Sequence, residues 1–175
     1  MRVRNGSIAD LEAVTRLHYE ITRTAYGDLF PSDRPPPPLD DLRREWSTTL
    51  ADVAVDVFVA EPDDIVGSAI LRPVGQKVNS VAEVKRVHVA TGWWRHGIGT
   101  ALLDRVVESA IERGFGQLNI WVIDANTRAR RFFEYYGWVL HRGEIAHHSD
   151  QGITEVRYDL VVETSRPDAR RSIPS

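Results

Sequence analysis

Apolar residues recur at three- and four-residue steps in four segments of the chain, and this spacing predicts amphipathic helices. Ser7 followed by Asp10 is typical of a helix N-cap and opens the first of them. Glycines close the last two, because Gly114 and Gly137 each follow a helix-like run. The predicted helices follow Ser7, cover 39–50, run from near Gly97 to Arg113, and cover 126–136.

Short runs rich in β-branched and aromatic residues lie between these helices and predict strands. The predicted strands are 2–4, 53–60, 65–71, 79–89, 118–123, 138–141 and 154–160. Alternation along 79–89 should place Val87 and Val89 on one face and His88 on the other. The order of elements predicts a mixed α/β (α+β) sheet with helices on both faces.

The 175-residue length suits one domain, which we expect to cover 1–162, with 163–175 as a flexible polar tail. Hydrophobic residues make up 42% and charged residues 27%, a balance typical of soluble globular domains. The net charge of −3 gives no broad basic field, so we expect neither a nucleic acid nor a membrane as partner. Residues 1–6 lack the apolar run of a signal peptide, which makes the cytoplasm the default location.

Residue types also argue against metal and thiol chemistry. The chain has no cysteine, which rules out disulfides, cysteine nucleophiles and thiolate metal sites. The run His147-His148-Ser149-Asp150 carries possible metal ligands. Adjacent histidines on an extended segment point to opposite faces, so one metal ion cannot easily use both. We therefore expect a surface loop there and no functional metal.

Gly97-Ile98-Gly99 lies between a predicted strand and a predicted helix. Glycine lets the backbone approach a ligand closely, and the first amides of a helix have no intrahelical partner. With the positive end of the helix dipole behind them, these amides suit a phosphate or pyrophosphate. A glycine turn used only for packing is the alternative. A dinucleotide site is disfavoured because Leu102 stands where its third glycine would be, and the Gly-Lys-Ser/Thr of a nucleotide-hydrolysing loop is absent.

Three segments together resemble the GNAT family of N-acyltransferases: 82–89, 97–103 and the pattern Asn126-x-x-Ala129-x-x-Phe132-Phe133-x-x-x-Gly137-Trp138. Their order and spacing match the family, and so does the element order from 2 to 160. The resemblance implies a GNAT-like fold, a twisted, mostly antiparallel sheet of about seven strands whose central strands splay apart. It also implies an acetyl-CoA-dependent N-acetyltransferase.

The same resemblance assigns positions to acetyl-CoA, the implied cosubstrate. The family signature Gln/Arg-x-x-Gly-x-Gly/Ala begins at Trp94, and the amides from Arg95 to Thr100 would hold the pyrophosphate. The strand around His88 would pair with the pantetheine arm, to which Asn126 would hydrogen-bond. The implied cofactor-binding residues are Val87, His88, Val89, Trp94, Arg95, His96, Gly97, Ile98, Gly99, Thr100, Asn126 and, near the sulfur, Ala129 and Phe133.

Two residues depart from the family pattern. Trp94 stands at the Gln/Arg position, which changes little because backbone amides bind most of the phosphate. Phe133 stands where many members carry a tyrosine that protonates the leaving thiolate, and phenylalanine has no proton to give. Tyr135 and Tyr136 are close in sequence but should point to other faces of the helix. The coenzyme A thiolate would then leave unprotonated or take a proton from water.

An amine attacks the acetyl carbonyl only when it is neutral, so the reaction needs a base and an oxyanion donor. By resemblance, the family's glutamate base corresponds to Glu83, whose alternative role is a cross-strand ion pair. His88 is the second candidate base because its ordinary pKa lies near working pH; its alternative is a buried, hydrogen-bonded histidine. The backbone amide of His88 or Val89 is the implied oxyanion donor. Glu83 and His88 are therefore the candidate catalytic residues.

We expect the acceptor to be a primary amine on a small molecule, with a protein N-terminus or lysine as the alternative. Tyr26, Asp28 and Trp46 belong to the region that covers the acceptor in this family; ordinary packing is their alternative role, and it is favoured for Trp46. Phe133 keeps open a non-catalytic acetyl-CoA-binding domain, and a purely structural domain is the last alternative. A homodimer is compatible with the resemblance. Three arginines form a solvated face of the last helix or meet the 3′-phosphate of coenzyme A: Arg128, Arg130 and Arg131.

Overall fold

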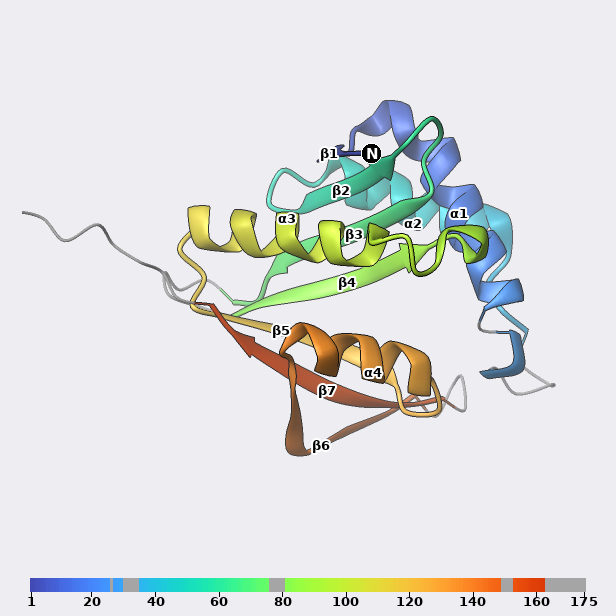
Figure 1. Ribbon diagram of the computed structural model, residues 1–175. Coiled ribbons are helices and arrows are strands. Elements are labelled where there is room, and N and C mark those ends of the chain that lie inside the picture. Colours follow the sequence, from blue (N-terminus) through green and yellow to red (C-terminus); the bar gives the residue numbers. More distant parts are fainter. Residues whose placement is uncertain (26, 30–34, 76–80, 149–152, 163–175) are drawn as a thin grey trace, which may run out of the picture.

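The computed structural model describes residues 1–25, 27–29, 35–75, 81–148 and 153–162, and its elements follow the predicted order (Figure 1). The helices are α1 Leu11–Thr24, α2 Leu39–Ala51, α3 Ile98–Glu112 and α4 Thr127–Tyr136, with short 3₁₀ turns at Ile8–Asp10, Gly27–Leu29 and Thr91–Trp93. The strands are β1 Arg2–Asn5, β2 Asp56–Glu61, β3 Gly67–Pro73, β4 Val81–Val89, β5 Gln117–Ile123, β6 Val139–His148 and β7 Ile153–Val161.

Two strand boundaries differ from the prediction by three residues or more. The strand predicted over 53–60 begins only at Asp56, because Asp52 folds the preceding residues into a turn. Its Oδ1 accepts the Ala54 N–H at 2.9 Å, its carbonyl accepts the Val55 N–H at 3.1 Å, and the side chain of Val53 is left fully exposed. In contrast, β6 continues well past the predicted end at residue 141, since its ladder with β7 satisfies the backbone where the apolar pattern stops.

The seven strands form one sheet in the order β1-β2-β3-β4-β5-β7-β6. Every neighbouring pair is antiparallel except β4 and β5, which run parallel. The parallel pairing covers only Val81–Glu83 against Gln117–Asn119, and the two strands separate beyond it. The predicted fold class, a mostly antiparallel sheet of about seven strands with splayed central strands, is therefore confirmed.

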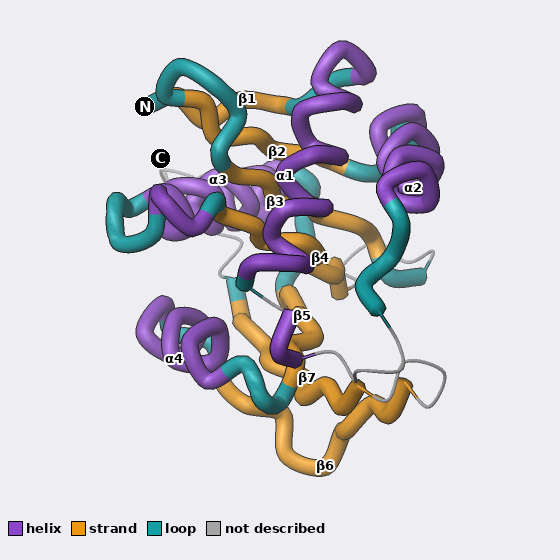
Figure 2. The backbone as a smooth tube through the Cα atoms, turned by 90° about the vertical axis from the view of Figure 1, so that its right-hand side faces the viewer, coloured by secondary structure: helices purple, strands orange, loops and turns teal. Residues whose placement is uncertain are grey.

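Helices cover both faces of the sheet, as predicted (Figures 1 and 2). Helices α1 and α2 lie on one face, and α3 and α4 lie on the other. The larger apolar core fills the α3–α4 face and includes Leu102, Leu118 and Tyr158. A smaller core on the α1–α2 face surrounds Trp46, whose side chain is fully buried. The burial of Trp46 in this core agrees with the packing role that the sequence favoured for it.

A β-bulge interrupts β4 and decides which side chains share a face. The pairing of β4 with β3 jumps from Ser68↔His88 to Ile70↔Lys85, and Arg86 has a left-handed backbone with φ 53°. Val87 and His88 still point to opposite faces, as predicted, because Val87 packs on the α3 core. The extra residue, however, brings His88 and Glu83 to one common cavity, although simple alternation would separate residues five positions apart.

Several predictions fall outside the described residues. They concern Tyr26, the proposed tail 163–175, and Ser149 with Asp150, whereas His147 and His148 lie in strand β6. Among the described side chains, no cluster of three His, Cys, Asp or Glu residues is arranged to hold a metal ion. No helix in the described part of the chain combines the length and apolar character needed to cross a bilayer.

Candidate active site

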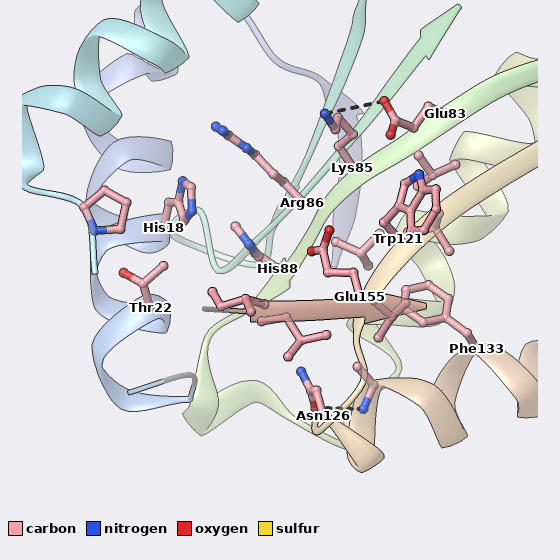
Figure 3. A pocket seen from close by; sticks show the side chains of 18 of the residues that line it. His18, Thr22, Glu83, Lys85, Arg86, His88, Trp121, Asn126, Phe133 and Glu155 are labelled. Atoms are coloured by element: carbon pink, nitrogen blue, oxygen red, sulfur yellow. Dashed lines mark hydrogen bonds and ion pairs between the residues drawn. The ribbon is translucent and has the colours of Figure 1, made fainter. Parts of the chain in front are cut away.

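The gap between β4 and β5 opens into a cavity of about 570 Å³ (Figure 3). Both strands line it, together with residues of α1, α2, α4 and β7. Since a parallel pair that separates leaves backbone groups of both strands without a ladder partner, the cavity offers main-chain donors as well as side chains. The polar and charged residues that line it are His18, Thr22, Glu45, Glu83, Lys85, Arg86, His88, Asn126 and Glu155.

The backbone of β4 presents alternate residues to the gap. The amide of Ala90 donates to the Val66 carbonyl at 2.8 Å, so Ala90 faces β3. Alternation then directs the amide of His88 to β3 as well, and those of Val87 and Val89 to the gap. Of the two predicted oxyanion donors, His88 and Val89, the geometry therefore favours Val89.

The turn before α3 is fixed to the end of β4. Trp94 donates its indole N–H to the Val89 carbonyl at 2.8 Å, and Arg128 stacks its guanidinium 3.5 Å from the centre of the Trp94 ring. Arg95 and Gly97 both have left-handed backbones, with φ 64° and 78°. The first helical hydrogen bond runs from Ala101 N–H to the Gly97 carbonyl, so the amides of residues 98–100 precede it at the exposed end of the helix.

The two glycines of this turn serve different purposes. Gly97 needs its positive φ, although a Cβ added there would meet no atom within 4 Å. Gly99 instead lies under an aromatic ring, because a Cβ there would come within 2.9 Å of Phe132 Cζ. Gly97 therefore provides the left-handed backbone of the turn, while Gly99 permits close packing of α3 on α4, which is the role that the sequence left as the alternative.

Helix α4 places Asn126, Ala129 and Phe133 along the cavity, one helical turn apart. Asn126 is the N-cap, since its Oδ1 accepts the Ala129 N–H at 3.1 Å. Phe133 is buried and packs edge-to-face on Trp138 with ring centres 5.7 Å apart.

The other predicted residues of α4 separate into distinct environments. Tyr135 is 93% exposed, and Tyr136 donates to Asp104 at 2.6 Å on the far side of the helix, so neither replaces a tyrosine at position 133. Burial, reinforced by Asp104, raises the pKa of Tyr136. Among the arginines, Arg130 is paired with Asp124 at 2.6 Å. Arg128 alone of the three contacts Trp94 of the turn, whereas Arg131 is exposed.

Two histidines meet at the α1 side of the cavity. The ring centres of His18 and His88 are 4.5 Å apart, and Trp46 donates its indole N–H to His18 Nδ1 at 3.3 Å. Burial, together with the charge of Arg86, lowers the pKa of His18 to about 3. Burial lowers the pKa of His88 well below its ordinary value as well, with His18 and Arg86 adding to the effect. Both imidazoles are therefore neutral at working pH.

The buried state of His18 predicts a specific acid sensitivity. Below pH 6.5, the ordinary pKa of histidine, His18 of the unfolded chain binds a proton. In the folded chain His18 stays neutral until about pH 3, so the free energy of unfolding falls as the pH falls through this window. At pH 5 the cost is about 2 kcal/mol. We expect the unfolding free energy of His18→Gln, measured in urea at pH 8 and pH 5, to fall by about 2 kcal/mol less than that of the unmodified chain. Equal losses for both chains would contradict the burial of His18.

Glu83 lies on the same cavity, but its ion-pair partner differs from the predicted one. Lys85 Nζ is 3.4 Å from Glu83 Oε2, so the partner is on the same strand rather than on a neighbouring one. The Glu83 side chain is 18% exposed and that of Lys85 is 46% exposed, so Glu83 is the inner member of the pair. A carboxylate at the cavity wall remains available to an amine that enters.

Several cavity residues were not identified from the sequence. They come from four different elements, and helix or strand periodicity alone does not bring them together: His18, Thr22, Glu45, Lys85, Arg86 and Glu155. A histidine on the buried stripe of α1 is the one signal that sequence inspection could have used, since an imidazole in such a stripe must find a polar partner.

Comparison with known proteins agrees with this geometry. Residues 18–138 match the model of the acetyltransferase (GNAT) family. The uncharacterized N-acetyltransferase YuaI of Bacillus subtilis (strain 168) is 26% identical over 129 residues, which cover 71% of this chain and 72% of YuaI.

Solved structures show the same fold. A ribosomal-protein-alanine N-acetyltransferase from Brucella melitensis superposes with a TM-score of 0.72 at 19% identity, covering 92% of this chain and 99% of that one. The Salmonella typhimurium acetyltransferase yncA, solved with its cofactor acetyl-CoA, gives a TM-score of 0.71 at 18% identity, covering 97% and 99%. The predicted family and enzyme class are confirmed: this chain belongs to the GNAT family of acetyltransferases.

Proposed function

We propose that this chain transfers the acetyl group of acetyl-CoA directly to a primary amine of a small molecule, within a ternary complex. The separation of β4 from β5 carries the proposal, because it combines gap-facing amides with a side-chain-lined cavity of about 570 Å³. That volume lies within the range of ordinary small-molecule sites, roughly 300–1,000 Å³.

The residues present suit acetyl-CoA. The amides of the turn 95–100 would hold the pyrophosphate at the positive end of α3, and Arg128 beside Trp94 adds a cation next to them. The gap-facing edge of Val87–Val89 would pair with the pantetheine arm as an added strand does. The Asn126 side-chain amide would donate to it, with Ala129 and Phe133 beside the thioester. In yncA the same fold holds acetyl-CoA.

We assign Glu83 as the base. The amine enters as an ammonium, Glu83 takes its proton directly or through a water, and the neutral nitrogen then forms the new C–N bond. The Val89 amide would donate to the oxygen that gains charge, the C–S bond breaks to release a thiolate, and the acetylated nitrogen loses its second proton to water. A buried, neutral His88 with a lowered pKa is a poor proton acceptor, so we give it a positioning role. Phe133 has no proton to donate, so the thiolate leaves unprotonated or takes a proton from water.

The second candidate acceptor is a protein N-terminus. Two structural neighbours are ribosomal-protein-alanine N-acetyltransferases, from Brucella melitensis and Escherichia coli. In favour of a small molecule, α1 and α2 contribute residues to the wall of the cavity of about 570 Å³.

Thiol release decides between these functions. Purified chain with acetyl-CoA should release free thiol when it is given members of a panel of small primary amines. A parallel panel of peptides with a free N-terminal alanine should give at most about a tenth of that rate at equal concentration. A tenfold ratio corresponds to a difference of about 1.4 kcal/mol between the two kinds of acceptor. Faster turnover of the peptides would replace the small-molecule proposal by the protein one. Acetyl-CoA binding without turnover of any amine would favour a non-catalytic binding domain.

A further inference from the structure

Arg86 combines a strained backbone with a place on the cavity wall. Its φ of 53° is unusual for a residue with a side chain, and such conformations cost on the order of 1–3 kcal/mol. The bulge it forms between Ser68↔His88 and Ile70↔Lys85 turns its side chain toward the α1 side of the cavity. Figure 3 shows Arg86 near His18 and His88, away from Phe133.

The guanidinium of Arg86 is only partly satisfied. Its side chain is 18% exposed, and Nη2 forms an ion pair with Glu45 of α2. Nη1 is buried, and no acceptor within the described parts of the chain reaches it. A buried donor without an acceptor costs free energy, so an acceptor oxygen that reached Nη1 would bind favourably.

The neighbouring groups favour one negative charge. His18 accepts at Nδ1 from Trp46, which leaves the proton of the neutral ring on Nε2 as a further donor. Glu45 already balances the single charge of Arg86, so each further negative charge on the ligand adds repulsion from Glu45. A carboxylate, with one charge and a planar edge that matches the guanidinium fork, therefore suits Arg86 better than a phosphate dianion.

We propose that the acceptor amine also carries a carboxylate and that Arg86 binds it; this rests on the proposed acetyl transfer. The amine would lie toward Glu83 and the Val89 amide, and the carboxylate toward Arg86 and His18. The substrate class is thus an amino acid or a related aminocarboxylate. Arg86 acts as a specificity-determining residue that touches the substrate but takes no proton.

Matched acceptors test this assignment. α-, β- and γ-amino acids are compared with their primary carboxamides, which keep the amine and remove the charge. We expect kcat/KM to favour the acid of at least one pair by about 10- to 100-fold, the size of one charge-assisted hydrogen bond. Arg86→Gln should abolish this preference, lowering kcat/KM for the acid by that factor more than for the carboxamide, and Arg86→Lys should restore only part of it. The matched control Arg44→Gln removes an exposed arginine of α2 that pairs with Asp41, and the preference should persist.

Three outcomes would overturn the assignment of Arg86. They are equal use of acid and carboxamide by the unmodified chain, an equal loss for both in Arg86→Gln, and a preference for amines that carry a phosphate. Calorimetry with N-acetyl amino acids and their carboxamides on the coenzyme A-loaded chain repeats the comparison without turnover. If no amine is acetylated, that result counts against acetyl transfer itself. The calorimetric comparison still tests whether Arg86 binds a carboxylate. Thermal unfolding shows whether Arg86→Gln is misfolded. If it is, the comparison of acid with carboxamide in Arg86→Lys and in the unmodified chain still tests the assignment.

Discussion

Gly97→Val is expected to weaken acetyl-CoA binding at least about 100-fold while the chain stays folded. Gly97 has φ 78°, a conformation that costs a residue with a side chain roughly 1–2 kcal/mol and is least tolerated by β-branched residues. Because nothing lies within 4 Å of an added Cβ, the substitution strains the turn without disturbing the core. The turn relaxes by reorienting the amides of 98–100, and two lost charge-assisted hydrogen bonds account for the expected factor.

Gly114→Val is the matched control. Gly114 has the same φ of 78°, also has no atom within 4 Å of an added Cβ, and lies at the opposite end of α3. Both variants should therefore lose similar stability in thermal unfolding, whereas calorimetry should show weakened acetyl-CoA binding only for Gly97→Val. Equal affinities for the two variants would remove the turn from the cofactor site.

Glu83→Gln should reduce acetylation by about 100-fold or more at pH 7, the lower end of what a general base contributes. Glutamine keeps the size and polarity of the side chain but takes no proton from the ammonium. The deficit should shrink as the pH is raised toward the pKa of the amine, because the amine then arrives neutral without a base. Rates of thiol release from pH 6 to pH 10 measure this dependence. A deficit that stays constant over that range would exclude Glu83 as the base.

Lys85→Met separates catalysis from ion pairing. It breaks the pair between Lys85 and Glu83 at 3.4 Å and leaves the carboxylate in place. If Glu83 serves only as half of that pair, both substitutions should lower the rate equally. If Glu83 is the base, Lys85→Met should lose much less activity than Glu83→Gln.

Local signals made much of the fold predictable from the sequence. The predicted helix end at Arg113-Gly114 is confirmed by Gly114, whose positive φ stops α3. Asn126 at the start of α4 and Gly137 at its end likewise act within one turn of their own helix. These capping residues need no tertiary context, so their positions could be predicted without it.

The acceptor end of the site depends on contacts that no local pattern encodes. Nothing in Lys85-Arg86-Val87 signals a left-handed arginine, because the bulge is imposed by the pairing with β3 and not by a glycine. Along α1, the buried stripe takes in His18 and Thr22, two polar residues that a search for apolar positions does not select. His18 meets His88 only after the sheet has formed, since the two residues are far apart in sequence.

Calorimetric titration of acetyl-CoA into the unmodified chain measures the cofactor site most directly. We predict one site per chain with a dissociation constant below about 1 mM, the upper end of ordinary substrate affinities. Acetyl-pantetheine, which lacks the pyrophosphate, should bind far more weakly, since the turn 95–100 would have no anion to hold. An absence of binding heat at millimolar acetyl-CoA, for a chain that circular dichroism shows to be folded, would contradict a working cofactor site between β4 and β5.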